Sequence, residues 1–122
     1  MIERGSGTII NISSIAARNG GGSSAIPYST AKAAMTCMSK GLAKELIGHG
    51  IRVNAVHPDV ILTPFHERFT PDERMKAMVS TIPQGRAGES EEIAGMITFL
   101  VSDKASHIVG KAIEINGGML MD

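Results

Sequence analysis

The feature that most constrains this chain is the pair Tyr28 and Lys32 at the start of a predicted helix, preceded by an apolar strand that ends in Ser13 and Ser14. Residues four apart lie on one face of a helix, so we expect the lysine ammonium close to the phenol. A phenol has a pKa of about 10, and a nearby positive charge favours its ionised form. We therefore predict that Tyr28 exchanges protons near neutral pH, while Ser14 hydrogen-bonds a substrate oxygen in the same crevice.

A tyrosine and a lysine at this spacing belong, by themselves, more often to a solvated helix face than to a catalytic pair. The longer run is more specific: Thr8-Ile9-Ile10-Asn11-Ile12-Ser13-Ser14, a loop, and then Tyr28-Ser29-Thr30-Ala31-Lys32-Ala33-Ala34. This run closely resembles the short-chain dehydrogenase/reductase family. The resemblance implies an oxidoreductase that interconverts an alcohol and a carbonyl with NAD or NADP. It also implies a catalytic trio of Ser14, Tyr28 and Lys32, with Lys32 bonded to the nicotinamide ribose.

The loop from His57 to Pro64 follows a second predicted strand, residues 51–56. Ligands of open parallel sheets bind beyond the carboxyl ends of the strands, so we expect this loop and Ser14 to border one crevice. The family's usual loop is Pro-Gly-x-Ile-x-Thr, and the resemblance implies that three residues here contact the nicotinamide: Pro58, Ile61 and Thr63. Asp59 stands where the family favours glycine, and it brings bulk and negative charge close to the ring.

The pattern of elements predicts an α/β fold with strands at 8–12, 51–56 and 111–116. The first strand has three isoleucines in five residues, which indicates burial on both faces. The strand, helix, strand order is that of a parallel unit with a right-handed crossover. With the resemblance, this implies the carboxyl-terminal half of a doubly wound Rossmann-type sheet, with three strands and flanking helices.

The helix predicted at residues 27–47 carries two stripes. A larger apolar stripe is expected to face the sheet: Ala31, Met35, Met38, Leu42 and Leu46. A second stripe has small side chains: Ala33, Cys37 and Gly41. In the resembling family this helix commonly packs against its copy in a second subunit, so we expect a homodimer or tetramer contact there, with packing inside the chain as the alternative. Cys37 is expected to be a small packing residue.

Two further helices are predicted. One is expected to begin with Thr70 as its N-cap and Glu73 closing a capping box, and the other to begin at Ser90. Between the second strand and the first of these helices lie three side chains where the family has its mobile substrate lid: Phe65, His66 and Phe69. Packing is the commoner role of such aromatic rings. The tail from Met119 to Asp122 is expected to be a subunit contact.

Composition excludes several classes of partner. Twelve basic and twelve acidic residues give no net charge, so we expect neither nucleic acid nor a membrane surface as a partner. No apolar run approaches the ~20 residues needed to span a bilayer, and the amino terminus lacks the apolar core of a signal peptide, so we expect a cytoplasmic protein. The histidines lack ligand spacing and are interpreted as surface or loop residues, so no metal site is expected: His49, His57, His66 and His107. A small alcohol or carbonyl compound is the partner that the resemblance implies.

The resemblance covers only about half of the family's domain. The glycine fingerprint for the pyrophosphate, the residue that selects NAD or NADP, and an asparagine of the proton relay have no counterpart in the sequence. The first strand would then be an open edge, which we expect to pair with another chain or to lie under other elements. The alternative to an enzyme is therefore a truncated, non-catalytic half-fold that dimerises.

Overall fold

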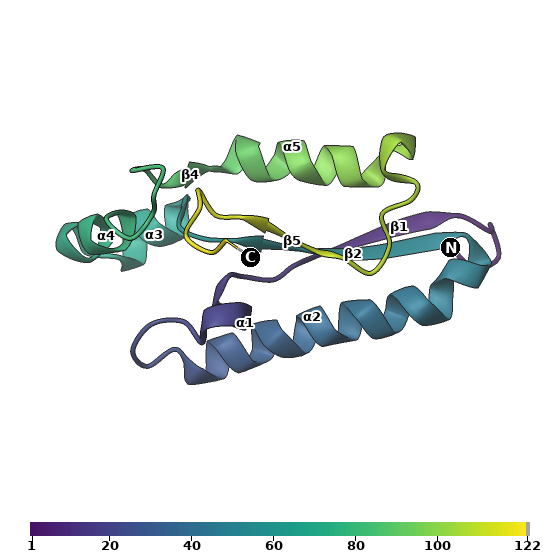
Figure 1. The fold of residues 1–122 in the computed structure, drawn as a ribbon, viewed down its shortest axis with the longest axis horizontal. Coiled ribbons are helices and arrows are strands. Elements are labelled where there is room, and N and C mark those ends of the chain that lie inside the picture. The colour runs from purple at the N-terminus through teal and green to yellow at the C-terminus, as the bar shows by residue number, and fades with distance from the viewer. Residues whose placement is uncertain (122) are drawn as a thin grey trace.

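Three parallel strands form the main sheet in the computed structural model of the chain, which describes residues 1–121 (Figure 1). Their order is β1 (Gly7–Ile12), β2 (Ile51–Pro58), β5 (Ala112–Ile115). The central strand β2 is in register with both neighbours, with Ile9 opposite Val53 and His57 opposite Glu114. The expected parallel α/β architecture is confirmed.

The connection from β1 to β2 covers one face of this sheet. It consists of α1 (Ala16–Asn19), α2 (Ile26–Leu46) and a 3₁₀ turn, η1 (Ile47–His49). The helix predicted at residues 27–47 thus begins one residue earlier, with proline in its first turn, where a missing N–H costs nothing. In Figure 1, β1 and β2 both run toward the end of the sheet at which α1 and the start of α2 lie.

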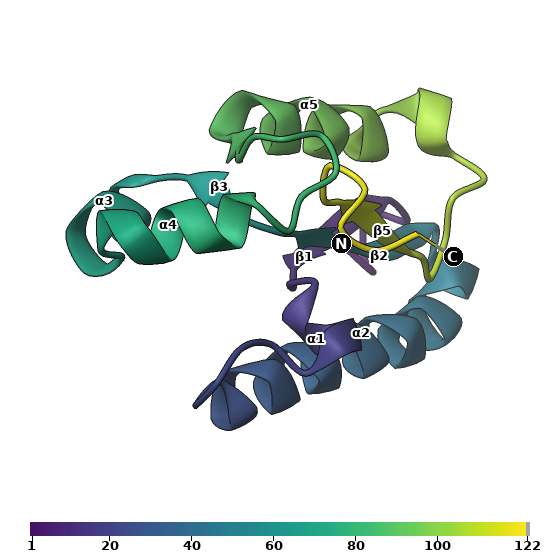
Figure 2. The ribbon, with the colours of Figure 1, turned by 60° about the vertical axis from the view of Figure 1, so that its left-hand side comes forward.

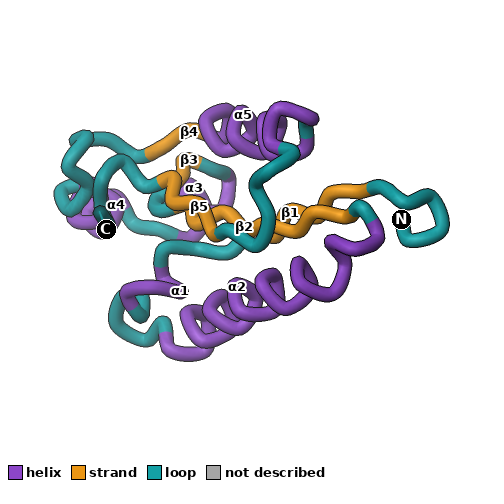
Figure 3. Tube along the Cα trace, turned by 45° about the vertical axis from the view of Figure 1, so that its right-hand side comes forward, coloured by secondary structure: helices purple, strands orange, loops and turns teal. Residues whose placement is uncertain are grey.

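The connection from β2 to β5 covers the other face. It contains β3 (Ile61–Leu62), α3 (Pro64–Phe69), α4 (Asp72–Val79), β4 (Gly88–Glu89), α5 (Ser90–Val101) and the 3₁₀ turn η2 (Asp103–Ala105). Figure 3 shows α5 on the side of the sheet opposite α2, and Figure 2 shows α3 and α4 beside the sheet. Strands β3 and β4, which pair as a second, two-stranded sheet, were not predicted from the sequence.

The core has one layer on each side of β2. Toward α2, Ile51 and Val53 pack with Ala43 of the helix. Toward α5, Val56 packs with Leu100. Alternate side chains of a strand point to opposite faces, so one strand supplies both layers. This is why β2 is the most deeply buried element of the chain.

The first strand lies at an edge of the sheet, as expected, because β1 pairs only with β2 among residues 1–121. The prediction that it is buried on both faces was wrong for this chain. Its residues are half-buried and Ile12 is 42% exposed. An isoleucine-rich strand requires cover on both faces, and the described part of the chain supplies only part of that cover.

The apolar stripe predicted for α2 is partly wrong. Ala31 and Met38 are exposed, whereas Ser29, Ser39 and Ala43 are buried. Serine can enter the interior because its hydroxyl bonds back to the helix: Ser39 Oγ donates to the carbonyl of Met35 at 2.8 Å. Cys37 and Gly41 point outward, so Cys37 does not pack inside the described chain as predicted.

The predicted capping box at Thr70 is also wrong. Helix α4 has Pro71 at its N-cap and no side-chain cap, and the Thr70 hydroxyl lies 2.8 Å from Nδ1 of His66 instead. Helix α5 begins at Ser90, as predicted, but its cap comes from Glu89 and Glu92, which form a reciprocal capping box. Within residues 1–121, no helix has the length and apolar character needed to cross a membrane.

Candidate active site

Tyr28 and Lys32 lie on the same side of α2, as their spacing predicts. The Lys32 Nζ is over the Tyr28 ring, 5.7 Å from its centroid. Tyr28 lies in the first turn of the helix and is 51% exposed, so a ligand can approach the phenol. A cation over the face of an aromatic ring is attracted by its quadrupole, which keeps the two side chains together.

Lys32 also holds the end of β1. Its ammonium group donates a hydrogen bond of 2.8 Å to the carbonyl oxygen of Ile12. An ammonium group has three donors, so this bond leaves others for a ligand. The atom that receives the bond is two residues before Ser14, and the contact therefore ties the helix to the strand end that carries the predicted serine.

Ser14 is buried, with 7% of its surface exposed. Its Oγ accepts a hydrogen bond of 3.1 Å from the backbone N–H of Ala16, at the start of α1. The hydroxyl hydrogen is not used in this bond, so Ser14 can donate it to an oxygen of a ligand. On either side of Ser14, the backbone N–H groups of Ser13 and Ile15 donate to the carbonyls of Val56 and Pro58 at 2.9 and 3.0 Å.

The predicted cofactor loop begins at the end of β2, beside this strand end. Pro58 is the last residue of β2, and the bond from Ile15 brings it next to Ser14. Ile61 lies in β3, and Thr63 is the N-cap residue of α3, with no bond from its hydroxyl to that helix. Ser14 follows the carboxyl end of β1 and Pro58 ends β2, and open parallel sheets bind ligands beyond such strand ends.

The family model described as Enoyl-(Acyl carrier protein) reductase matches residues 1–120. The chain belongs to the short-chain dehydrogenase/reductase family. It is 41% identical over 121 residues to the 3-oxoacyl-(acyl-carrier-protein) reductase FabG of Thermotoga maritima, covering 99% of this chain and 48% of that protein. It is 45% identical over 118 residues to the uncharacterized oxidoreductase YmfI of Bacillus subtilis, covering 97% and 48%.

Comparison with solved structures leads to the same family. A crystal structure from Beutenbergia cavernae, of a protein provisionally described as an NAD(P)-dependent gluconate 5-dehydrogenase with NADP bound at low occupancy, superposes with a TM-score of 0.89. The sequences are 33% identical, and the match covers 98% of this chain and 48% of that one. This chain thus spans about half the length of the short-chain dehydrogenase/reductase relatives that it matches.

Asp59 is where the chain departs from the family's usual loop. Burial raises the pKa of this carboxyl to about 6, with a smaller contribution from the charge of Glu92. Its Oδ2 atom is buried and has no hydrogen-bond partner among residues 1–121. The carboxyl borders a small cavity of about 50 Å³, whose wall also includes Arg86 and Gly117. Its protonation is therefore expected to change within the range of pH used in ordinary assays.

Glu92 is the fixed charge beside Asp59. Arg86 donates two hydrogen bonds to its carboxylate, at 2.7 and 2.8 Å, and the backbone N–H of Glu89 donates a third at 2.8 Å. These bonds, the Arg86 bond first, lower the pKa of Glu92 to about 2. Of the two neighbouring carboxyls, Asp59 is therefore the one that takes up a proton.

The interpretation of His57 as a surface or loop residue was wrong. His57 lies in β2 and has no exposed surface. Its Nε2 lies 2.9 Å from the Thr36 hydroxyl, and its Nδ1 lies 3.0 Å from Glu114 Oε1. The signal in the sequence was its position directly after Val56, in a strand otherwise suited to the interior.

Within residues 1–121, no group of His, Cys, Asp and Glu has the arrangement of a metal site.

The segment predicted as a lid forms α3, next to the loop. Phe65 and Phe69 are 63% and 61% exposed, and their ring centroids lie 5.3 Å apart. Burial, with the charge of Arg74, lowers the pKa of His66.

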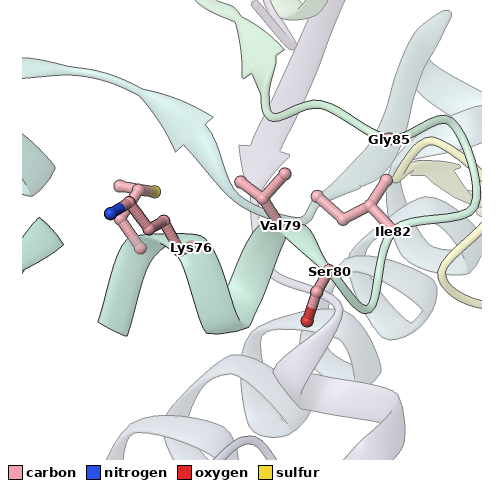
Figure 4. Close-up of a pocket in the computed structure, with 6 residues that line it drawn as sticks. Lys76, Val79, Ser80, Ile82 and Gly85 are labelled. Atoms are coloured by element: carbon pink, nitrogen blue, oxygen red, sulfur yellow. The ribbon is translucent and has the colours of Figure 1, made fainter. Parts of the chain in front are cut away.

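A separate hollow of about 350 Å³ lies along α4 and the segment directly after it, lined by Met75, Lys76, Val79, Ser80, Ile82 and Gly85 (Figure 4). It contains none of the predicted catalytic residues.

Proposed function

We propose that residues 1–122 are the carboxyl-terminal half of an NAD- or NADP-dependent oxidoreductase that interconverts an alcohol and a carbonyl. The observation that carries this proposal is the arrangement of Tyr28 and Lys32, in which the ammonium lies over the ring and also binds the carbonyl of Ile12. That arrangement places a cation beside an accessible phenol, at the strand end that bears Ser14. Membership of the short-chain dehydrogenase/reductase family supports the same chemistry.

Each residue of the trio has a proposed role. Ser14 donates its hydroxyl hydrogen to the substrate oxygen, and Tyr28 passes a proton to or from that oxygen. Lys32 holds the phenol in place from over its ring and uses its remaining donors on the nicotinamide ribose. Proton transfer by a positioned group contributes roughly 10² to 10⁴ in rate. The nicotinamide, when bound, supplies or accepts the hydride.

The residues present suit only part of such a cofactor. Thr63 has a hydroxyl that does not cap α3, Pro58 is the last residue of β2, and Ile61 begins β3. These residues are proposed to hold the nicotinamide. A Rossmann sheet binds its dinucleotide across two halves, so we propose that the pyrophosphate and adenosine are held by a partner half with the glycine fingerprint.

The relatives suggest which substrates to test. FabG of Thermotoga maritima is described as a 3-oxoacyl-(acyl-carrier-protein) reductase, and the Beutenbergia cavernae protein as a gluconate dehydrogenase with NADP bound. We propose a small alcohol or carbonyl compound as the substrate of this protein, a homodimer or tetramer as its assembly, and the cytoplasm as its location. The outward face of α2 around Cys37 and Gly41, and the tail, are the proposed subunit contacts.

A second function, a non-catalytic half-fold that dimerises, has one observation in its favour. Strand β1 is an apolar edge with Ile12 42% exposed, which is a template for pairing with another chain. Titration of NADH and NADPH, followed by nicotinamide fluorescence, separates the two functions when intact mass is verified. Binding, together with turnover of acetoacetyl-CoA or gluconate by the full-length protein, supports the enzyme. A folded full-length protein that binds neither cofactor contradicts it.

A further inference from the structure

A continuous set of hydrogen bonds crosses the sheet beneath the proposed active site. It runs from Glu114 in β5 to His57 in β2, and then to Thr36 in α2, with distances of 3.0 and 2.9 Å. From Thr36 it continues to Ser13 at 3.0 Å. Ser13 Oγ then donates to the backbone carbonyl of Lys32 at 2.8 Å. We call these four partly or fully buried side chains the hydroxyl–imidazole network.

The hydrogen positions in this network follow from which groups can accept. Glu114 Oε1 lies 3.0 Å from both Arg18 Nη1 and His57 Nδ1, and as the acceptor of both bonds it receives a hydrogen from each. The His57 hydrogen is therefore assigned to Nδ1. In this tautomer Nε2 is an acceptor, and it takes the single hydrogen of the Thr36 hydroxyl.

This assignment determines which hydroxyl holds the Lys32 carbonyl. Thr36 Oγ1 and Ser13 Oγ both lie within hydrogen-bond distance of that oxygen, at 3.0 and 2.8 Å. Because the Thr36 hydrogen is used on His57, Ser13 supplies the bond, and its single hydrogen is shared between the Lys32 carbonyl and Thr36 Oγ1. Ser13 precedes Ser14, and the side chain of Lys32 binds Ile12 on the other side of Ser13. The strand end is thus fastened to the Lys32 turn at two points.

We infer that His57 and Thr36 are positioning residues for the proposed reaction, with Glu114 fixing the imidazole of His57. Through Ser13 they set where Ser14 lies relative to Lys32 and Tyr28. None of the four network residues is in the catalytic trio. The inference rests on the proposed function, since the distance that it controls matters only if Ser14 and Tyr28 act on the same oxygen.

Thr36→Val tests the inference, because valine keeps the shape of threonine and removes the hydroxyl. We expect kcat to fall at least about tenfold with little change in the KM for NADPH, since a small displacement of a catalytic group costs rate more than binding. Thr36→Ser restores the hydroxyl and is expected to restore kcat. The assays use the full-length protein, with acetoacetyl-CoA and NADPH or with gluconate and NADP.

Ser39→Ala is the matched control. Ser39 is buried in the same helix and bonds back to Met35, as Thr36 does to Lys32, but its partner in the strand is Asn11 at 2.8 Å. A similar loss of thermal stability in both variants, with kcat reduced only in Thr36→Val, supports positioning. Equal losses of kcat, or a kcat that serine does not restore, would overturn it.

A second measurement does not depend on turnover. In protein labelled with ¹⁵N-histidine, the His57 signals are expected to show a hydrogen on Nδ1 and a bonded acceptor at Nε2, and Thr36→Val should shift only the latter. An unchanged Nε2 signal contradicts the network. If Tyr28→Phe keeps full turnover, the proposed function itself fails. If Tyr28→Phe is inactive while Thr36→Val is fully active, the function stands and this inference alone is wrong.

Discussion

The Lys32 ammonium binds the carbonyl oxygen of Ile12 at 2.8 Å, which joins the second turn of α2 to the last residue of β1. The Lys32 Nζ atom also lies over the Tyr28 ring. One side chain therefore connects the predicted proton-transfer group with the strand end that carries Ser14.

Tyr28→Phe is expected to remove most turnover of the full-length protein, by roughly 10² to 10⁴, because the proton-transfer group is lost. The fold should be retained, since the side chain is 51% exposed and phenylalanine keeps the ring beneath Lys32. Steady-state kinetics and a thermal melt of the same samples measure both effects. Turnover comparable to that of the wild type would contradict the assignment of Tyr28.

Lys32→Met is expected to lower turnover and also to weaken cofactor binding, because both the charge and the donors are removed. Lys40→Met is the matched control, since Lys40 is exposed on the same helix, two turns away from Lys32. Fluorescence titration with NADPH and steady-state kinetics give the two readouts. An equal effect of the two substitutions would mean that general charge, and not the site, is responsible.

Asp59→Asn is expected to stabilise the protein at neutral pH. Burial raises the pKa of Asp59 from 3.8 to about 6, so folding disfavours its ionised form. The free-energy cost of ionising Asp59 in the folded protein is absent below pH 3.8, grows between pH 3.8 and about 6, and is constant above that. Since the carboxyl is partly exposed, screening reduces the expected gain at pH 7.5 to about 1 kcal/mol.

Urea unfolding at pH 7.5 and at pH 3.5 measures this difference for Asp59→Asn. The gain in the free energy of unfolding should be present at the higher pH and absent at the lower one. Asp72→Asn, at an exposed carboxylate in the first turn of α4, is the control and should give no gain. A gain that is the same at both values of pH would show that ionisation is not its cause.

The β1 edge is expected to be covered in solution, by another chain or by further elements of a longer protein. If a protein of 122 residues and verified intact mass is studied, Ile12→Lys should weaken its self-association, because a charge on an edge strand opposes pairing. Ile26→Lys, at a residue 76% exposed outside the sheet, is the control. A monomer with fast amide exchange along β1 would contradict this prediction.

The local sequence determined the elements of the main sheet and the spacing of the trio. The strand boundaries near Ile51 and Ala112, the long helix, and the closeness of Lys32 to Tyr28 all follow from periodicity of two or about four residues. The family resemblance added the chemistry. These features could be predicted because each depends on residues that are close in the chain.

Contacts between distant residues were decided only by the tertiary structure. The buried face of α2 includes Ser29 and Ser39, and apolar periodicity did not predict that face. His57 is buried because Thr36 and Glu114, from other elements, lie within hydrogen-bond distance of its two ring nitrogens. Likewise, the pKa of Asp59 depends on cover from elements far along the chain. A buried polar group is stable only when its partners are in place, and a sequence does not state which partners the fold will bring.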